Sequence, residues 1–397
     1  MFESLELKPK DPILKLAAEA RNDPSPQTVD LSVGVYKTEQ GDTPIFDAIK
    51  AAEKYRLDNE HTKTYMGILG DERFNHKVAE LIFGKDHAVF RDNRITSLQS
   101  IGGSGALFIA GRLLCEANPN VTISAGDPTW GNHIPLLTSA GVKMESLPYY
   151  DQAAKQVDFD AMMTQMATLN AGAVVLLHGC CHNPTGADLS HQQWAQLADL
   201  VIERGLIPFV DIAYHGLATD LDTDAYSWRM LADRVPEMLV AYSCSKNFGL
   251  YRDRIGLLAV ISKNAEASAI TQSNLMSISR ATYSMPAAHG AFAVAEVLDQ
   301  DDLRSSWTTE LAQMRDRVAG ARQGFANAIA EKIGSSDFDF VARQNGMFSF
   351  LGLTPSQIDT LKREYSIYMV GSSRVNVAGL TESNIDYVAN AIARVLP

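Results

Sequence analysis

The chain has 397 residues, which is too long for one small core and predicts two or three structural units. Hydrophobic residues make up 46% and charged residues 21%, as in ordinary globular proteins. The 47 acidic and 35 basic residues give a formal net charge of -12, which argues against nucleic acid or an anionic membrane as the main partner. A small anionic substrate is still compatible, because a few arginines can dominate one pocket.

The sequence has no pattern of a targeting or membrane segment. Charges at Glu3, Glu6 and Lys8 interrupt the N-terminus, so it lacks the apolar core of a signal peptide. The apolar run Ala171–Leu177 is far shorter than the ~20 residues that span a bilayer. The 4 cysteines do not form a disulfide framework. We therefore expect a soluble, cytoplasmic protein with reduced thiols.

The N-terminal part predicts an arm, a strand and two helices. Asp11-Pro12 has the cap and the first-turn proline of a helix start, so the residues before it form an arm. Val29–Tyr36 alternates as a strand does, and Gly34 within it would allow close approach of a ligand or of backbone. Phe46–Leu57 and Glu72–Phe83 have helical spacing.

From about Ile95 the sequence alternates between strands and helices, which predicts a mainly parallel α/β sheet. The expected strands are Val121–Ser124, Val174–His178, Pro208–Tyr214, Met238–Cys244 and Leu257–Ile261, and the expected helices end near Cys115 and Arg204. The remaining stretch, Phe338–Pro397, predicts a smaller α+β domain that the N-terminal segment joins. Its expected elements are strands in Gly346–Leu353 and Ser372–Val377 and helices at Pro355–Tyr365 and Thr381–Leu396.

Lys246 stands between hydroxyl residues where an apolar run ends, in Ser243-Cys244-Ser245-Lys246. Burial lowers the pKa of a lysine and frees its amine to attack a carbonyl. Arg254 would bring a fixed positive charge back to the same pocket. Because most lysines are surface charges, this pattern alone favours neither a nucleophile nor a solvated side chain.

Asp211 lies inside the apolar strand, where a carboxylate without a partner would be costly to bury. It is either a cap for a neighbouring loop or the counter-ion of a cationic heterocycle. Tyr214 would reach the same pocket.

The glycine turn Gly102-Gly103-Ser104-Gly105 opens a helix, where free N–H groups and the helix dipole favour phosphate. Its spacing matches neither the P-loop nor the dinucleotide fingerprint, so nucleotide binding is not favoured.

The segment Cys180-Cys181-His182 raises the question of a metal site. Adjacent residues of an extended chain point to opposite faces, and no second cluster has zinc-like spacing, so packed thiols and no metal are expected. Asn183-Pro184 is a candidate cis bond, which would aim the Asn183 amide inward.

Ser243 to Lys246 also matches the S-x-x-K motif of penicillin-recognising serine enzymes, which need partner motifs of the S-D-N and K-T-G type. The nearest strings here are Arg91-Asp92-Asn93 and Lys37-Thr38-Glu39. Acyl transfer by Ser243 is therefore a minor alternative, and a binding module without enzymatic activity is another.

The candidate groups would meet at the carboxyl edge of the sheet, where such folds bind ligands. They comprise an amine for an aldehyde, a carboxylate for a ring nitrogen, donors for a phenolic oxygen and a phosphate cradle. Those are the needs of pyridoxal 5'-phosphate, which is the cofactor that the residues predict.

Three segments carry a resemblance to a known family: Ser243–Tyr251, His178–Gly186 and Asn345–Phe350. They resemble the bacterial aspartate aminotransferases of fold type I, over essentially the whole chain. The resemblance implies a large domain with a mainly parallel seven-stranded sheet flanked by helices, and a smaller α+β domain. The implied boundaries are an arm at 1–13, part of the small domain at 14–47, the large cofactor-binding domain at 48–312 and the small C-terminal domain at 313–397.

The resemblance also implies roles around the cofactor. Lys246 would form the aldimine and later move a proton between the substrate α-carbon and the cofactor, while Asp211 would keep the pyridine nitrogen protonated. Tyr214 and Asn183 would contact the phenolic oxygen. The phosphate would be held by Gly102, Gly103, Ser104, Ser243, Ser245 and Arg254, and Trp130 would stack over the ring with His133 and His178 in support.

The implied substrates are amino acids and 2-oxo acids. Arg374 would bind the α-carboxylate as a bidentate fork. Arg280 would bind a side-chain carboxylate from the partner subunit, and Tyr65 would cross to the partner's phosphate, so the resemblance implies a homodimer with shared sites. The remaining implied substrate contacts are Gly34, Trp130 and Asn183.

The implied activity is transamination between L-aspartate and 2-oxoglutarate, giving oxaloacetate and L-glutamate by a ping-pong cycle through pyridoxamine phosphate. The aromatic aminotransferases share most of the motifs and are the alternative. Ser104, where aspartate enzymes often have threonine, and Met285 depart from the pattern. They leave open how well the pocket accepts aromatic side chains.

Overall fold

A computed structural model describes all 397 residues, Met1–Pro397, as two compact units. The larger unit contains Pro44–Asn183 and Ala187–Asp316, and the smaller contains Met1–Thr43, Pro184–Gly186 and Arg317–Pro397. These units divide after residues 43 and 316, whereas the expected domain boundaries follow residues 47 and 312 and stay a prediction.

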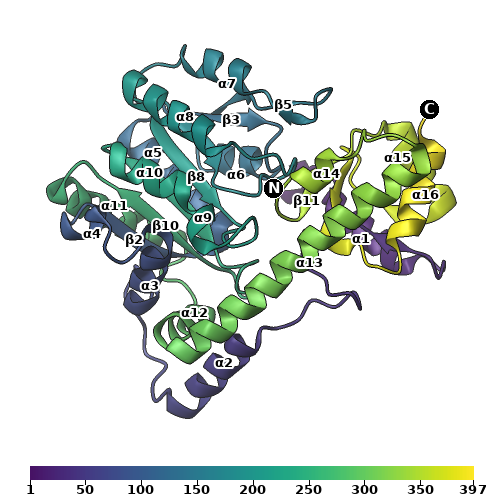
Figure 1. Cartoon of the computed structure of the whole chain (residues 1–397). Coiled ribbons are helices and arrows are strands. Elements are labelled where there is room, and N and C mark those ends of the chain that lie inside the picture. The colour runs from purple at the N-terminus through teal and green to yellow at the C-terminus, as the bar shows by residue number, and fades with distance from the viewer. The chain divides into compact units, whose positions relative to one another are not determined.

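The larger unit is built on a seven-stranded sheet (Figure 1). In spatial order its strands are β2 (Ile95–Ile101), β10 (Ile255–Ile261), β9 (Met238–Ser243), β8 (Ile207–Ile212), β7 (Val174–His178), β3 (Thr122–Asp127) and β4 (Lys143–Pro148). Neighbouring strands are parallel except where β10 pairs with β2 and with β9. The expected mainly parallel α/β fold is confirmed.

Helices and one small hairpin complete the larger unit. They are α2 (Asp47–Asn59), α3 (Glu72–Phe83), α4 (Ala88–Arg91), α5 (Gly102–Ala117), α6 (His133–Ser139), β5 (Tyr150–Asp151), β6 (Gln156–Val157), α7 (Phe159–Met166), α8 (His191–Arg204), α9 (Leu221–Asp224), α10 (Tyr226–Arg234), α11 (Ala265–Thr282), α12 (Ala288–Asp299) and the first half of α13 (Asp301–Ile333). None of the helices in the chain is both long enough and apolar enough to cross a membrane.

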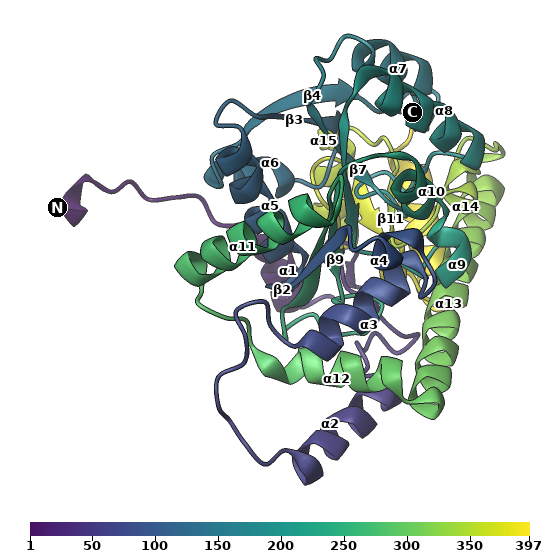
Figure 2. The ribbon, with the colours of Figure 1, turned by 90° about the vertical axis from the view of Figure 1, so that its left-hand side faces the viewer.

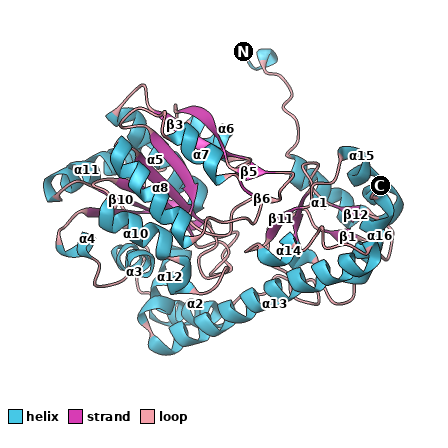
Figure 3. Cartoon of the chain, turned by 45° about the horizontal axis from the view of Figure 1, so that its top comes forward, coloured by secondary structure: helices cyan, strands magenta, loops and turns pink.

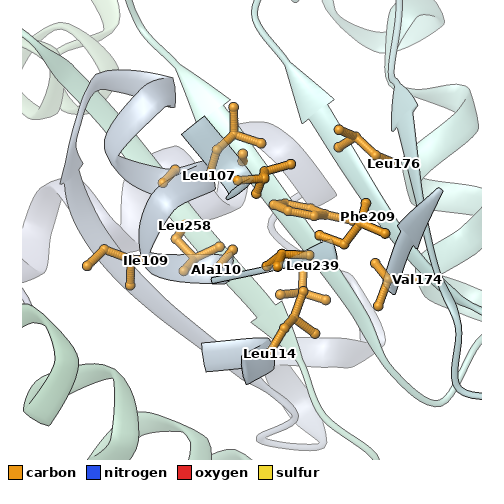
Figure 4. Close-up of a cluster of buried hydrophobic side chains, with 14 of the residues drawn as sticks. Leu107, Ile109, Ala110, Leu114, Val174, Leu176, Phe209, Leu239 and Leu258 are labelled. Carbon is orange, nitrogen blue, oxygen red and sulfur yellow. The ribbon is translucent and has the colours of Figure 1, made fainter. Parts of the chain in front are cut away.

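The main core of the larger unit lies between the sheet and α5. Its buried side chains include Leu107, Ala110 and Leu114 of α5 and Leu176, Phe209, Leu239 and Leu258 of four strands (Figure 4). Phe209 and Leu258 are fully buried. Removing that much apolar surface from water, about 25 cal/mol per Å², is the main force that holds α5 against the strands. The start of α5 is therefore fixed at one edge of the sheet.

The opposite face of the sheet is covered as well. Figure 2 shows α3 and α10 on the side of the sheet opposite to α5, and α3 packs against β2 and β10. Because side chains alternate along a strand, the residues between those of the first core face this side. Trp228 of α10 is fully buried, and its indole Nε1 donates to the carbonyl of Ile82 in α3 at 2.8 Å. A Cβ at Gly179 would lie 2.8 Å from the Trp228 ring, so only glycine allows the chain to pass there. Because both faces are covered, the strands are continuous apolar runs.

The smaller unit combines short strands with helices (Figure 3). Its elements are two 3₁₀ helices, Phe2–Ser4 and Val377–Gly379, with α1 (Pro12–Asn22), β1 (Val29–Asp30), the second half of α13, α14 (Phe340–Arg343), β11 (Phe348–Phe350), α15 (Pro355–Tyr365), β12 (Ile367–Tyr368), β13 (Arg374–Asn376) and α16 (Ile385–Val395). β1 pairs with β12 in parallel, and β11 pairs with β13 antiparallel. The segment before α1 is extended in Figure 2.

The expected strand Val29–Tyr36 is wrong beyond Asp30. The Asp30 carboxylate accepts hydrogen bonds from the backbone N and the hydroxyl of Ser32, which turns the chain out of the strand. The Asn376 amide then donates to the carbonyls of Val33 and Val35, so a side chain replaces the ladder that a strand would need. The expected strands around 346–353 and 372–377 are likewise shorter, only three residues each.

Candidate active site

The strand ends that carry the predicted residues meet at one edge of the large sheet. β2, β3, β7, β8 and β9 end there, and the antiparallel β10 begins there. The register pairs Ile101, the last residue of β2, with Ile255, the first of β10. Gly102 and Arg254 are therefore neighbours, and a Cβ on Gly102 would lie 2.6 Å from Nη2 of Arg254. Backbone pairing thus brings a guanidinium to the N-terminus of α5.

A cavity of about 190 Å³ opens at this edge. It is lined by Gly103, Ser104, Leu107, Trp130, His178, Asn183, Asp211, Ala213, Tyr214, Ser243, Ser245, Lys246 and Arg254, all of them in the larger unit. Most of the predicted site residues thus surround one cavity, although they come from six different strand ends. Their individual roles stay predictions.

Lys246 follows β9 and faces the cavity. Its Nζ lies 5.1 Å from the centre of the Tyr214 ring. Burial lowers the pKa of Lys246 to about 8, with the Asp211 charge opposing and the Arg254 charge assisting that shift. The turn that presents the lysine closes through Gly249, whose N–H donates to the Lys246 carbonyl and whose φ is +67°. The neutral amine that nucleophilic and proton-transfer chemistry need is therefore accessible near neutral pH.

Asp211 lies one residue before the end of β8 and is 7% exposed. Burial works against its ionisation, but the hydrogen bond from His133 Nε2 at 3.0 Å and nearby positive charges bring its pKa below the usual value. The carboxylate therefore stays ionised inside the protein. Such a group suits the protonated nitrogen of a heterocycle.

A chain of hydrogen bonds continues from Asp211 through Thr129. The Thr129 hydroxyl bonds to Nδ1 of His133 at 2.8 Å and to Nε2 of His178 at 3.0 Å. Burial lowers the pKa of His178 to about 3, so this imidazole is neutral. We did not predict Thr129 from the sequence. Its spacing of four residues from His133 was the available signal, and only the fold brings His178 to it.

The glycine turn, two serines and Arg254 form an anion subsite. Arg254 has φ +58° and donates from Nη1 to the Tyr251 carbonyl at 3.0 Å, with the Ser245 hydroxyl at 3.5 Å. The backbone N–H of Ser245 donates to the Ser243 hydroxyl. A fixed guanidinium, hydroxyls and the open N–H groups of a helix start are the donors that a phosphate binds.

Asn183 supplies a buried polar atom without a protein partner. The residue is 6% exposed, lines the cavity, and its Oδ1 makes no hydrogen bond. The suggested cis bond at Asn183-Pro184 is wrong, since the cis peptide of this chain is Asp127-Pro128. Trp130 packs edge-on against His133, with ring centres 5.2 Å apart.

These groups fit pyridoxal phosphate. The anion subsite suits its phosphate, the Asp211 carboxylate its ring nitrogen, and the Lys246 amine its aldehyde. Asn183 offers an unpaired amide oxygen beside the cavity. In contrast, no three His, Cys, Asp or Glu side chains are grouped to hold a metal.

Four predicted residues of the larger unit lie outside the cavity lining: Gly102, His133, Tyr65 and Arg280. Gly102 directly precedes the lining residue Gly103, and His133 donates to the lining residue Asp211. Tyr65 is 93% exposed, in the loop between α2 and α3. Arg280 is exposed in the last turn of α11, and its Nη1 donates to the Ser284 hydroxyl at 2.5 Å. Neither Tyr65 nor Arg280 contributes to the cavity of its own chain.

Gly34 and Arg374 belong to the smaller unit. Arg374 is 7% exposed, donates to the Ser32 carbonyl at 2.6 Å, and lies 4.4 Å above the Phe348 ring. A Cβ on Gly34 would lie 2.8 Å from Cζ of Phe348. The glycine therefore gives room to a neighbouring side chain of its own unit.

Comparison with known proteins agrees with this geometry. The family model described as aminotransferase class I and II matches residues 26–392. The chain belongs to the class I and II aminotransferase family. It is 43% identical to the aspartate aminotransferase of Haemophilus influenzae and 42% identical to the aromatic-amino-acid aminotransferase of Paracoccus denitrificans, with 100% of each chain covered.

A solved structure extends the comparison to the cofactor. The aromatic-amino-acid aminotransferase of Burkholderia pseudomallei, covalently bound to pyridoxal phosphate, superimposes with a TM-score of 0.96 at 40% identity, over 100% of both chains. Pyridoxal phosphate is the cofactor of the family, as predicted from the sequence. The chain is thus an aminotransferase, and its fold is that of the family.

We expect Gly102→Ala to weaken cofactor binding. The new Cβ would displace the Arg254 guanidinium, and φ +65° would strain any residue with a side chain. The dissociation constant of pyridoxal phosphate should rise about tenfold or more, a loss of ~1.4 kcal/mol. Titration of the apoenzyme measures it, with Gly320→Ala as the control because nothing lies within 4 Å of that position. Wild-type affinity in Gly102→Ala would place the phosphate elsewhere.

We also expect the aminotransferase to lose stability as the pH falls from about 6.5 to 4. Burial lowers the pKa of His215 from 6.5 to about 4, so the folded imidazole stays neutral while the unfolded one binds a proton. The loss attributable to His215 approaches about 3 kcal/mol at pH 4. Denaturant unfolding at several pH values should give a shallower slope for His215→Gln. Equal slopes would contradict this assignment.

Proposed function

We propose that this aminotransferase exchanges amino groups between L-aspartate and 2-oxoglutarate, giving oxaloacetate and L-glutamate by a ping-pong cycle. The observation that carries the proposal is a pair of arginines besides the one in the anion subsite. Arg374 is buried and held by a backbone carbonyl, while Arg280 presents its guanidinium to solvent beside Ser284. An arginine can bind one carboxylate through two parallel hydrogen bonds. A substrate with two carboxylates therefore needs two such arginines.

The proposal includes a homodimer with shared active sites. Tyr65 and Arg280 stay exposed in the single chain and do not line its cavity. A second copy would bring both to the cavity of its partner, where Tyr65 would contact the phosphate and Arg280 the distal carboxylate. The cytoplasmic location expected from the sequence stays a prediction.

The chemistry divides among residues of the cavity. Bound pyridoxal phosphate supplies an electrophilic carbonyl and a ring that withdraws electrons. Lys246, with its pKa lowered to about 8, takes a proton from the substrate α-carbon and returns it during the cycle. Asp211 keeps a negative charge in the base of the cavity, and Arg254 holds the phosphate.

Aromatic amino acids are the alternative substrates. Relatives named for aspartate and for aromatic amino acids have nearly equal identity to this chain, 43% and 42%. Ser104 and Met285 also leave this alternative open. Membership of the aminotransferase family, in contrast, argues against the two other hypotheses, which were acyl transfer by Ser243 and a module without enzymatic activity.

We expect Arg280→Ala to change the choice of substrate. Wild-type enzyme should have a kcat/KM for aspartate at least about tenfold above that for phenylalanine, since discrimination resides in that ratio. Loss of a charge-assisted fork should lower kcat/KM for aspartate ~100-fold and that for phenylalanine less than about threefold. Steady-state kinetics with both amino acids measures the four constants.

Two variants control this experiment. Arg363→Ala removes an exposed arginine that pairs only with Asp359 on the same helix, and should change neither ratio. Lys246→Ala should be colourless with cofactor and inactive with both substrates. A wild-type preference for phenylalanine would replace aspartate as the proposed substrate.

Shared active sites predict complementation between two inactive chains. A hybrid dimer of Lys246→Ala and Arg280→Ala chains has both changes at one site and neither at the other. Mixing the variants under conditions that exchange subunits should therefore recover aspartate activity, up to about a quarter of the wild-type value when the chains pair at random. No recovery in verified hybrids would mean that Arg280 acts within its own subunit.

A further inference from the structure

A second hydrogen-bonded chain lies behind the cavity and involves none of the lining residues. Asn247 Nδ2 donates to the Tyr242 hydroxyl at 2.7 Å, and that hydroxyl lies 3.0 Å from Nδ1 of His215. Nε2 of His215 lies 2.6 Å from the carbonyl of Leu221. The three side chains are at most 1% exposed. The sequence analysis did not predict a function for Tyr242, His215 or Asn247.

The direction of each hydrogen bond can be assigned. The carbonyl of Leu221 can only accept, so Nε2 of His215 carries the proton. Burial lowers the pKa of His215 to about 4, which leaves Nδ1 unprotonated at neutral pH. The Tyr242 hydroxyl therefore donates to His215 and accepts from Asn247. Nδ2 of Asn247, the Tyr242 hydroxyl and both ring nitrogens of His215 each have a partner, whereas Oδ1 of Asn247 is buried without one.

Two residues of the network directly follow residues that line the cavity. His215 directly follows Tyr214, and Asn247 directly follows Lys246, both of which line the cavity. Tyr242 itself is fixed in β9, between β8 and β10. One hydroxyl is thus shared by the segment that carries Tyr214 and the turn that carries Lys246.

The turn after Lys246 is also held from another side. The indole Nε1 of Trp307 donates to the carbonyl of Asn247 at 2.6 Å, and the Trp307 ring stacks on Phe248 with ring centres 4.5 Å apart. Trp307 is fully buried in α13. With its carbonyl held by Trp307 and its amide by Tyr242, Asn247 has little freedom to shift. The backbone position of Lys246 is therefore restrained by Asn247, the residue that follows it.

We propose that Tyr242 is a positioning residue for transamination, whose hydroxyl keeps Lys246 and Tyr214 at a fixed separation. The separation that it maintains is the 5.1 Å between Lys246 Nζ and the Tyr214 ring. Rates of reaction between positioned groups fall steeply with displacement, on the order of 100-fold for 1 Å. The inference rests on the proposed roles of Lys246 and Tyr214, and it adds a group that contacts neither substrate nor cofactor.

The test is Tyr242→Phe in the cofactor-loaded enzyme. This change keeps the buried ring but leaves Nδ2 of Asn247 and Nδ1 of His215 each without a partner. We expect kcat with aspartate to fall about tenfold while KM stays within about twofold, because binding groups are untouched. The pH midpoint of the visible absorption of the resting enzyme should also shift, by about 0.3 or more, since it reports the surroundings of the Lys246 nitrogen.

Tyr387→Phe is the matched control. Its hydroxyl donates to the carbonyl of Tyr365 at 2.6 Å in the smaller unit, so the same chemical change is made in the unit that does not contain the cavity. It should leave kcat and the absorption midpoint unchanged. A Tyr242→Phe enzyme with wild-type kcat and midpoint would overturn the proposal, and so would equal losses in the two variants.

Two variants of His215 test the same link if Tyr242→Phe does not fold. A glutamine can accept from Tyr242 and donate to Leu221, whereas a leucine can do neither. His215→Gln should keep at least about half of kcat, and His215→Leu should lose about tenfold. Equal kcat in the two would overturn the proposal. An active Lys246→Ala enzyme would instead contradict the proposed function, so the two failures are distinguishable.

Discussion

The candidate active site depends on how an ionised carboxylate and a lysine amine share one buried cavity. Asp211 is almost fully buried, and it stays charged because His133 donates to it and positive groups lie nearby. For Lys246 the uncharged form is favoured instead, since burial and the Arg254 charge lower its pKa to about 8. The same enclosure therefore keeps a carboxylate ionised and lets a lysine amine lose its proton near pH 8, as the proposed roles of the two residues require. Neither property belongs to the residue alone.

The sheet makes this arrangement possible through one antiparallel strand. β10 lies between β2 and β9, so its first residue reaches the edge where the parallel strands end. That places Arg254 against Gly102, at the N-terminus of α5. A cation, a helix start and serine hydroxyls then converge on one anion subsite. The core between α5 and the strands keeps this helix start in place.

Local pattern was enough to predict many elements of the chain. Glu72–Phe83, Val174–His178 and Pro355–Tyr365 have the expected limits, because caps and apolar periodicity act within a few residues. The strand predicted for the residues after Asp30 does not form. The Asn376 side chain of β13 donates to the carbonyls of Val33 and Val35, in the place that a neighbouring strand would take. No periodicity within 31–36 contains that information.

The sequence by itself determined the chemistry on offer: a lysine, a carboxylate, an arginine and a glycine turn at strand ends, in motifs long enough to indicate the family. Only the tertiary structure decided which groups act together. Thr129 joins two histidines that are 45 residues apart in the chain, 133 and 178, and Tyr242 joins the neighbours of Tyr214 and Lys246. The reason is physical, since donor and acceptor assignments and pKa shifts depend on burial and on partners that only folding brings within 3 Å.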